Sequence, residues 1–369
     1  MVIILWLVTV FSINSLFYPS LCTFFKVSLA VFAISSSPLC YLLQSRGNIC
    51  DPQSLPYLLL LIQSRLLYDH LAVMSTFAKS TFSATGYATF RPTYPPTIYR
   101  RVLEYHRGAK NVCVDLGCGH GVVSRELSPH FKQIIATDPS AVMVSQARSS
   151  SPQQNITFRE ASAEDLSFIE DGTLDLVVAG QAAHWFDYTK VWAELQRKLR
   201  QGGTIAFWGY KDNVFPKYPK ATVLLDRYCY AMDKDLMGPF WEQPGRSILR
   251  DRLRAIVPPE ELYEDVQRVE YEPNAVGTAE GSFGERIMYK TLKLGEVEGY
   301  TRTFSAFHGW QEAHPDKISR AKGGEGDLVD EMLDEMLEAE PEWKAQGDAW
   351  RDFEVETEWG SAILLARKK

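Results

Sequence analysis

The chain has 369 residues, enough for one large domain or two smaller ones, and a formal net charge of −7 at pH 7. Hydrophobic residues make up 46% and charged residues 23%, which is ordinary globular composition. An acidic chain without a basic stripe is a poor binder of nucleic acid, because contacts to phosphates dominate that affinity. These numbers exclude DNA and RNA as expected partners and favour a small-molecule substrate.

The first 73 residues differ in composition from the rest of the chain. Residues 1–25 carry no charged side chain. An uncharged stretch of this length could form a membrane helix, but Pro19 interrupts the apolar pattern. No basic residue precedes this stretch, as a secretory signal would require. At Met74 the composition turns polar. Three interpretations of residues 1–73 stay open: an extension that is not translated or does not fold, a membrane anchor, and a cleaved signal.

Beyond this segment, helical and strand patterns alternate, which favours βαβ units and a parallel sheet. The predicted strands are, in chain order, 112–116, 134–137, 156–159, 174–179, 204–208 and 362–366, with 304–307 as a neighbour of the last. The predicted helices are 97–107, a helix that begins at 122, 140–149 with Ser140 as N-cap, 188–200 with Gly202-Gly203 at its end, and an acidic surface helix at 327–342.

Between residues 210 and 300 the periodicity changes to loops rich in aromatic residues and proline. The stretch is too long for a simple connection, so we interpret 211–299 as a helical cap inserted over the ligand face. The chain then divides into the extension at 1–73, a core at 74–210, this insert, and 300–369, which completes the sheet.

The strand at 112–116 leads into the most informative motif, VCVDLGCGHG at residues 112–121. Its three glycines let the backbone turn sharply and let a ligand approach with no Cβ in the way. Asp138 follows Gly117 by 21 positions, at the end of the next strand. A doubly wound fold places a carboxylate there to accept hydrogen bonds from ribose hydroxyls.

The spacing of the glycines separates two cofactor classes. A dinucleotide site has G-x-G-x-x-G and seats a pyrophosphate on a helix N-terminus. This chain has G-x-G-x-G, and Asp115 lies two residues before the first glycine. A carboxylate there would repel a pyrophosphate and suits a ligand with a positive end, such as the ammonium of a methionine moiety. A nicotinamide dehydrogenase is therefore disfavoured, and the motif resembles motif I of the class I S-adenosylmethionine-dependent methyltransferases.

This resemblance implies a doubly wound α/β fold with a mostly parallel, seven-stranded Rossmann-like sheet, and S-adenosylmethionine as the cofactor. Ligands bind beyond the carboxyl ends of the strands in such sheets. We therefore expect the cofactor contacts at the ends of the first four strands: Asp115, Gly117, Cys118, Gly119, Asp138, Pro139, Ser162, Ala163, Glu164 and Gln181. For Glu164 and its neighbour Asp165, the N-cap of a short turn is an equal alternative.

The loop after the fourth strand, AAHWFD at 182–187, closely resembles the corresponding loop of small-molecule methyltransferases of the methyltransferase-11 type. The resemblance places His184 and Trp185 near the reacting methyl group, and the alternative is an aromatic pair packed in the core. A hydroxyl or amine nucleophile would need His184 as its base. A carboxylate would need no base, because it is already ionised at neutral pH.

Two further segments, GYATFRPTYP at 86–95 and YTRTFSAFHGWQEAHPD at 300–316, resemble signatures of the fungal trans-aconitate methyltransferases. The cantharidin-detoxifying methyltransferases of yeasts belong to the same group. The resemblance implies O-methylation of a small carboxylic acid, with Arg302 as a catalytic-site anchor and Arg91 and His308 as further candidates. It covers residues 80–369, although the insert does not align and residues 1–73 have no counterpart.

Two other functions stay open at this point: methylation of a hydroxyl in secondary metabolism, and a catalytically silent subunit that binds the cofactor. We expect a monomer in the cytoplasm. We expect no metal ion, since the six cysteines contain no C-x-x-C pair. Membrane association would arise only through residues 1–73.

Overall fold

A computed structural model describes residues 89–273 and 282–369. All of these residues belong to the compact unit Met74–Lys369. The three interpretations of residues 1–73, and the first part of the signature at 86–95, lie outside the described residues. Among the residues that are described, no helix is long and apolar enough to cross a membrane.

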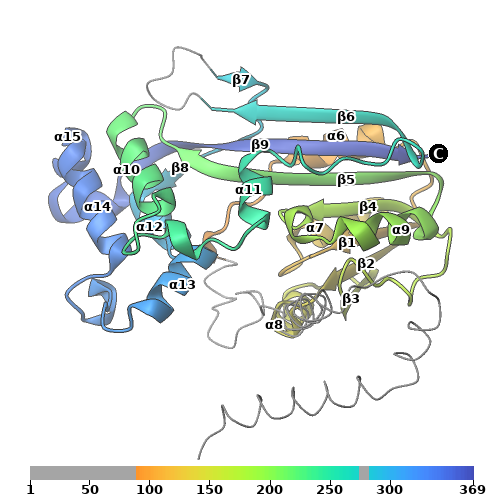
Figure 1. Ribbon diagram of the computed structural model, residues 1–369, viewed down its shortest axis with the longest axis horizontal. Helices are drawn as coiled ribbons and strands as arrows, with labels where there is room; N and C mark the ends of the chain where they lie inside the picture. The colour runs from red at the N-terminus through yellow and green to blue at the C-terminus, as the bar shows by residue number, and fades with distance from the viewer. Residues whose placement is uncertain (1–88, 274–281) are drawn as a thin grey trace, which may run out of the picture. The chain divides into compact units, whose positions relative to one another are not determined.

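The described residues build one mixed sheet whose strands run in the order β3-β2-β1-β4-β5-β9-β6-β7, with β8 paired to β9 (Figure 1). The strands are β1 Val112–Leu116, β2 Gln133–Asp138, β3 Ile156–Glu160, β4 Leu174–Gly180, β5 Leu199–Val214, β6 Tyr263–Glu272, β7 Phe283–Gly284, β8 Met288–Lys293 and β9 Glu354–Lys368. Strands β1 to β5 pair in parallel, and β9 is antiparallel to β5, β6 and β8. The predicted doubly wound, mostly parallel α/β sheet is confirmed, and two short strands extend it beyond the seven expected.

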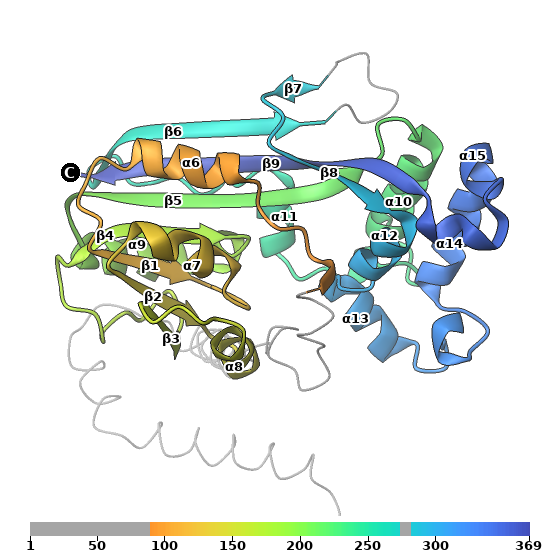
Figure 2. The ribbon, with the colours of Figure 1, turned by 180° about the vertical axis from the view of Figure 1, so that it is seen from behind.

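The helices are α6 Pro96–Tyr105, α7 Val122–Leu127, α8 Ala141–Ser149, α9 Tyr188–Lys198, α10 Pro219–Tyr230, α11 Gly245–Arg250, α12 Leu294–Thr301, α13 Ser305–Ala313, α14 Leu328–Ala339 and α15 Pro341–Lys344. Short 3-10 turns are η2 Ser128–His130, η3 Ala183–Trp185, η4 Gly238–Phe240, η5 Arg320–Lys322 and η6 Gly347–Asp352. The predicted cap of α8 is present, because the Ser140 hydroxyl accepts from the Met143 backbone N–H. Helices α6 and α7 cover one face of the sheet, and α9 and α11 cover the other (Figures 1 and 2).

Two apolar clusters hold these layers on the sheet. Successive side chains of a strand point to opposite faces, so neighbours in β1 enter different clusters. Cys113 packs in the cluster that includes α6 and α7, and Val114 packs in the cluster that includes α9 and α11. The central strands are thus buried on both faces, which explains why they read as continuous apolar runs in the sequence.

The segment 211–299 is not the helical cap that the sequence predicted. It contains α10 and α11, but β6, β7 and β8 as well, and β6 pairs with β9 along the outer part of the sheet. The strand β6 was hidden because most of its side chains are polar. Glu270 and Glu272 of β6 form ion pairs with Arg252, so the strand carries charge without an apolar pattern.

Two smaller predictions are also wrong. Residues 304–307, predicted as a strand beside the last one, form the start of α13, and β6 takes that place in the sheet. Gly202-Gly203 lies inside β5, since α9 ends at Lys198 with Leu199 as its C-cap. The acidic segment forms α14 as expected, but one face of that helix is buried rather than solvated.

Candidate active site

The glycine turn after β1 leads into α7, as predicted, and two of its glycines serve different purposes. Gly117 and Gly119 have φ of 68° and 54°. A Cβ on Gly117 would lie 2.5 Å from the Cβ of Ala182, whereas a Cβ on Gly119 would meet no atom of the chain within 4 Å. Gly117 is therefore required by the packing of the protein itself, and Gly119 borders open space at the carboxyl end of the sheet.

Asp115 lies fully buried beside this turn. Its Oδ2 accepts from the Ser124 hydroxyl at 2.5 Å, and its Oδ1 has no hydrogen-bond partner within the described ranges. Burial raises the pKa of Asp115 to about 7, against the lowering effect of the Ser124 hydrogen bond. A buried oxygen without a partner is costly, and a positively charged ligand group would satisfy it. The nearby Tyr99 hydroxyl, which sequence reasoning missed, is also buried and makes no hydrogen bond to any described residue.

Asp138 ends β2 with its carboxylate held in a fixed orientation. Oδ2 accepts the backbone N–H of Gly119 at 2.9 Å, and Oδ1 accepts that of Ser140 at 2.8 Å. Burial raises the pKa of Asp138. Cys118 is tied to the same strand, since its backbone N–H donates to the Thr137 carbonyl at 2.8 Å. Pro139 follows on the exposed side of the strand end.

The loop after β3 contains Ser162, Ala163 and Glu164, which were predicted to pass the adenine ring. Ala163 is buried, and Glu164 Oε1 accepts the backbone N–H of Asp187 at 2.8 Å. Glu164 thus joins this loop to the loop after β4. The turn-capping role that the sequence left open belongs to Asp165, whose Oδ1 accepts the Ser167 N–H at 3.0 Å.

Gln181, another predicted cofactor contact, uses its side chain within the fold. Its side-chain amide donates to the Tyr210 carbonyl at 2.9 Å and accepts the Tyr210 N–H at 2.8 Å. The side chain therefore links the end of β4 to β5 and has its donor and acceptor engaged within the fold. The backbone of Gln181 has φ of 56°, a left-handed conformation that is costly for a residue with a Cβ and is often found at functional sites.

The turn η3 carries His184 and Trp185, with ring centroids 4.7 Å apart. His184 is buried, and its Nδ1 has no hydrogen-bond partner in the described part of the chain. Burial lowers the pKa of His184 to about 3, and the positive charges of Arg246 and Arg91 contribute. Trp185 is 39% exposed, which argues against the alternative of an aromatic pair packed in the core.

Aromatic side chains from distant segments lie next to this strand end, and we call them the aromatic wall: Tyr94, Trp208, Tyr210, Tyr300, Phe304 and Trp359. Their ring centroids are 4.9 to 6.4 Å apart from one member to the next. The wall starts at the end of β4, where a Cβ on Gly180 would lie 3.1 Å from Trp208 Nε1. It ends at Arg91, whose guanidinium lies 5.5 Å from the ring centroids of Tyr300 and Phe304.

The predicted anchor Arg302 is not part of this arrangement. Its guanidinium pairs with Asp327 and with Asp330 at 2.8 Å, at the start of α14, and with Glu298 at 3.3 Å, on its own helix α12. His308 Nε2 lies 3.4 Å from Glu312 on the same helix. Arg302 therefore joins α12 to α14 and is not available to anchor a substrate, whereas Arg91 lies at the aromatic wall.

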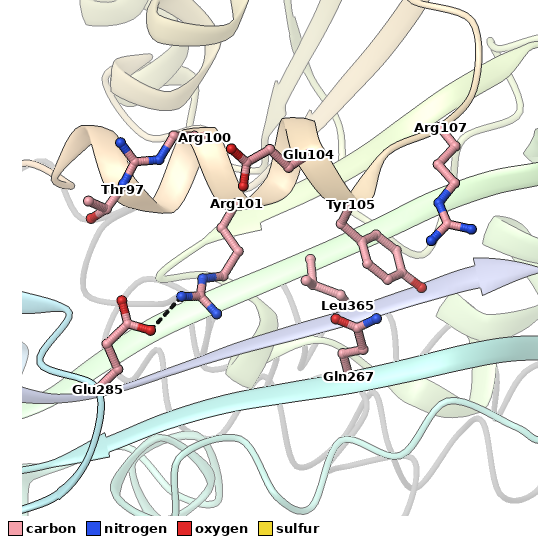
Figure 3. Close-up of a pocket in the computed structure, with 9 residues that line it drawn as sticks. All are labelled: Thr97, Arg100, Arg101, Glu104, Tyr105, Arg107, Gln267, Glu285 and Leu365. Carbon is pink, nitrogen blue, oxygen red and sulfur yellow. Dashed lines mark hydrogen bonds and ion pairs between the residues drawn. The ribbon is translucent and has the colours of Figure 1, made fainter.

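A cavity of about 410 Å³ lies under α6, against β6 and β9 (Figure 3). Its lining residues are Thr97, Arg100, Arg101, Glu104, Tyr105, Arg107, Gln267, Glu285 and Leu365. Arg101 points across it and pairs with Glu285 at 2.5 Å (Figure 3). The lining includes neither the glycine turn nor η3, so this cavity is separate from the site at the strand ends.

Comparisons with known proteins agree with this geometry. The family described as "Methyltransferase domain" (Methyltransf_11) matches residues 114–207, from β1 to β5. A Saccharomyces cerevisiae protein named "Probable S-adenosylmethionine-dependent methyltransferase CRG1" is 27% identical, over 80% of this chain and 99% of its own length. A methyltransferase of Claviceps purpurea is 24% identical, over 79% of this chain and 93% of its own. The chain is an S-adenosylmethionine-dependent methyltransferase.

A solved structure shows the same fold for this methyltransferase. The protein, from Anaeromyxobacter dehalogenans, is assigned as a type II methyltransferase and superimposes with a TM-score of 0.55 at 24% identity. The match covers 76% of this chain and 98% of the other.

The strand ends of the methyltransferase fit its cofactor. The open space at Gly119 can receive a ligand, and the buried Asp115 oxygen without a partner suits an ammonium group. We propose that Asp115 binds the methionine ammonium and that Asp138 binds the ribose hydroxyls. Two carboxylates beside one turn would repel a pyrophosphate, which agrees with the exclusion of a dinucleotide.

The affinity for S-adenosylmethionine should depend on pH through Asp115. The ammonium needs the ionised carboxylate, whose pKa is about 7 in the free protein and would be lower in the complex. Affinity should therefore fall as pH drops below that value, by roughly tenfold per pH unit. Calorimetry with S-adenosylhomocysteine, in buffers of different ionisation enthalpy, measures both this slope and the proton released near pH 7. Asp115→Asn should bind weakly with no slope, and a pH-independent parent affinity would contradict the assignment.

Proposed function

We propose that this methyltransferase transfers a methyl group to a carboxylate oxygen of a small acid, of the trans-aconitate kind. The observation that carries the proposal is that His184 is buried, with its Nδ1 atom lacking a hydrogen-bond partner in the described part of the chain. Burial, together with the positive charges of Arg246 and Arg91, lowers the pKa of His184 to about 3. Two cations thus act on the turn η3, and its imidazole is not basic.

The two nucleophile classes make opposite demands on such a site. When bound, S-adenosylmethionine supplies an activated methyl group. A hydroxyl must lose a proton as it attacks, and a base works best when its pKa lies near the operating pH. His184 binds a proton far too weakly for that task. A carboxylate is ionised already, so the chain needs only to hold it, with positive charge nearby and little water around it.

Two other features support an acid as the substrate. The aromatic wall can exclude water from the carboxylate, which removes hydration that would otherwise shield the nucleophile. The resemblance of 86–95 and 300–316 to trans-aconitate methyltransferases points in the same direction. Arg91 belongs to the first of these segments, and its NH2 donates to the Thr303 carbonyl at 3.0 Å, in the second.

The test is product identification followed by a pH profile. The full chain is incubated with S-adenosylmethionine and a panel of trans-aconitate, other small acids, phenols and alcohols, and the products are identified by mass. We expect a methyl ester, and a kcat at saturating cofactor that stays flat between about pH 6 and 9, because the acid is ionised throughout. His184→Gln should lower kcat less than about tenfold, whereas loss of a general base typically costs about 10²–10⁴-fold.

Two outcomes would overturn the proposal. A methylated phenol or alcohol, with a rate that rises with pH and a large loss in His184→Gln, would assign hydroxyl methylation. Cofactor binding without methylation of any compound class would support the silent subunit.

A further inference from the structure

We propose that Arg246, at the start of α11, holds the carboxylate of the substrate through its Nε–H. The inference rests on the proposed methylation of an acid and names the residue that orients that acid. This arginine lies outside residues 114–207, the range that the methyltransferase family matches.

The Arg246 guanidinium is held rigidly in a mostly buried place. Its side chain is 10% exposed. The NH2 group donates to the Asp212 carboxylate and to the Tyr230 hydroxyl. The guanidinium carbon lies 4.1 Å from the ring centroid of Trp241 and 4.9 Å from that of Tyr230. These contacts fix the plane of the group before any ligand arrives.

The Nε–H of this fixed group is a buried donor without an acceptor in the described part of the chain. Such a donor is costly to leave unsatisfied, so a ligand that brings an acceptor is favoured. The Arg250 Nε also donates to Asp212 at 2.8 Å, and Arg250 pairs with Asp226 as well, at 3.3 Å. Arg246 therefore shares its mostly buried carboxylate partner with a second cation.

The position of α11 brings this donor to the methyl-transfer end of the sheet. A Cβ on Gly245 would lie 2.6 Å from the Trp185 ring and 3.2 Å from the His184 carbonyl oxygen, so the residue before Arg246 packs directly on η3. On the other side, the Trp241 ring that contacts the Arg246 guanidinium has its centroid 5.5 Å from that of Phe304, a member of the aromatic wall. Arg246 is thus connected to η3 through Gly245 and to the aromatic wall through Trp241, which is where the proposed function needs a group that holds the acid.

Arg250 provides a matched control for this role. It also pairs with Asp212 and lies against the Tyr230 ring, at 4.1 Å from the centroid. Its side chain is 40% exposed, however, and its remaining ion pair is with the surface residue Asp226. A variant at Arg250 therefore removes the same carboxylate tether without removing the buried donor.

The experiment compares Arg246→Gln, Arg246→Lys and Arg250→Gln, with trans-aconitate as the probe acid. We measure KM and kcat for the acid, calorimetric binding of the acid to the S-adenosylhomocysteine complex, the affinity for S-adenosylhomocysteine itself, and the melting temperature. Arg246→Gln should weaken acid binding and raise KM by roughly 10- to 100-fold, as expected for a lost charge-assisted hydrogen bond. Its affinity for S-adenosylhomocysteine should stay within about twofold, and Arg250→Gln should change KM less than about threefold.

Arg246→Lys serves if the glutamine variant fails to fold. It keeps the charge toward Asp212 but loses the Nε–H and the planar ring contacts, so its melting temperature should fall less than that of the glutamine variant while its KM is still raised. Equal increases of KM in the Arg246 and Arg250 variants, with equal losses of melting temperature, would make Arg246 a structural tether and overturn the inference. Failure of the proposed function looks different, because the parent enzyme then methylates no acid in the panel, and both proposals fall together.

Discussion

Gly119→Ala is expected to abolish useful binding of S-adenosylmethionine while the protein stays folded. A Cβ at this position meets no atom of the chain within 4 Å, so the added methyl group disturbs no protein packing. It would occupy space that we assign to the cofactor, beside Asp115 and Asp138. We expect a loss of affinity of at least about 100-fold, equivalent to roughly 2.7 kcal/mol, by calorimetry with S-adenosylhomocysteine. The left-handed backbone adds a folding cost of about 1 kcal/mol.

Gly117→Ala is the matched control, and it should lower the stability of the fold, whereas Gly119→Ala should lower the affinity for the cofactor. Its Cβ would lie 2.5 Å from that of Ala182, so either the turn or the loop after β4 must move. We expect a lower melting temperature, from a cost of about 1–3 kcal/mol for overpacking. The double variant Gly117→Ala/Ala182→Gly should recover part of this loss, because the clashing partner is gone. Equal destabilisation of the Gly117 and Gly119 variants, with cofactor binding retained, would refute the assignment of the space beside Gly119 to the cofactor.

The parts of the fold that could be predicted are those with a local signal. Strands β1 and β4 are buried on both faces, so each appears in the sequence as an apolar run. Strand β6 could not be predicted in this way, because only its ends, at Tyr263 and Tyr271, are buried and the residues between are polar or half-exposed. Its pairing with β9 is a contact between residues far apart in the chain.

In the candidate site, too, residues with a local sequence signal could be predicted and residues brought together by distant contacts could not. Asp115, Gly119 and Asp138 follow from motif spacing, because a single strand–turn–helix unit and the next strand bring them together. The arginine prediction failed for a related reason. A short signature holds Arg302 and carries no information about the acidic cap of α14 that binds it. Arg246 meets η3 only through the packing of α11, which no local pattern encodes.

Arg302→Ala should therefore act on stability and not on substrate binding. Asp327 is fully buried and caps α14, since its Oδ1 accepts the backbone N–H groups of Val329 and Asp330. Removing the guanidinium leaves two buried carboxylates close together without their cation. Loss of one partner of a buried ion pair typically costs several kcal/mol, and with Arg302 20% exposed we expect about 3 kcal/mol, measured by urea unfolding.

The pH dependence of this loss separates the structural role from a role in binding. Burial raises the pKa of Asp330, but backbone N–H bonds from Asp327 and Arg320 and the charge of Arg302 outweigh it and hold the pKa below its ordinary value. A carboxyl with a depressed pKa stabilises the fold above its unfolded pKa and loses that contribution as pH falls. Without Arg302 the depression weakens, so the stability difference between parent and variant should stay constant above about pH 4 and shrink as pH falls below it. KM for the acid should not change, and a raised KM at unchanged stability would return Arg302 to the active site.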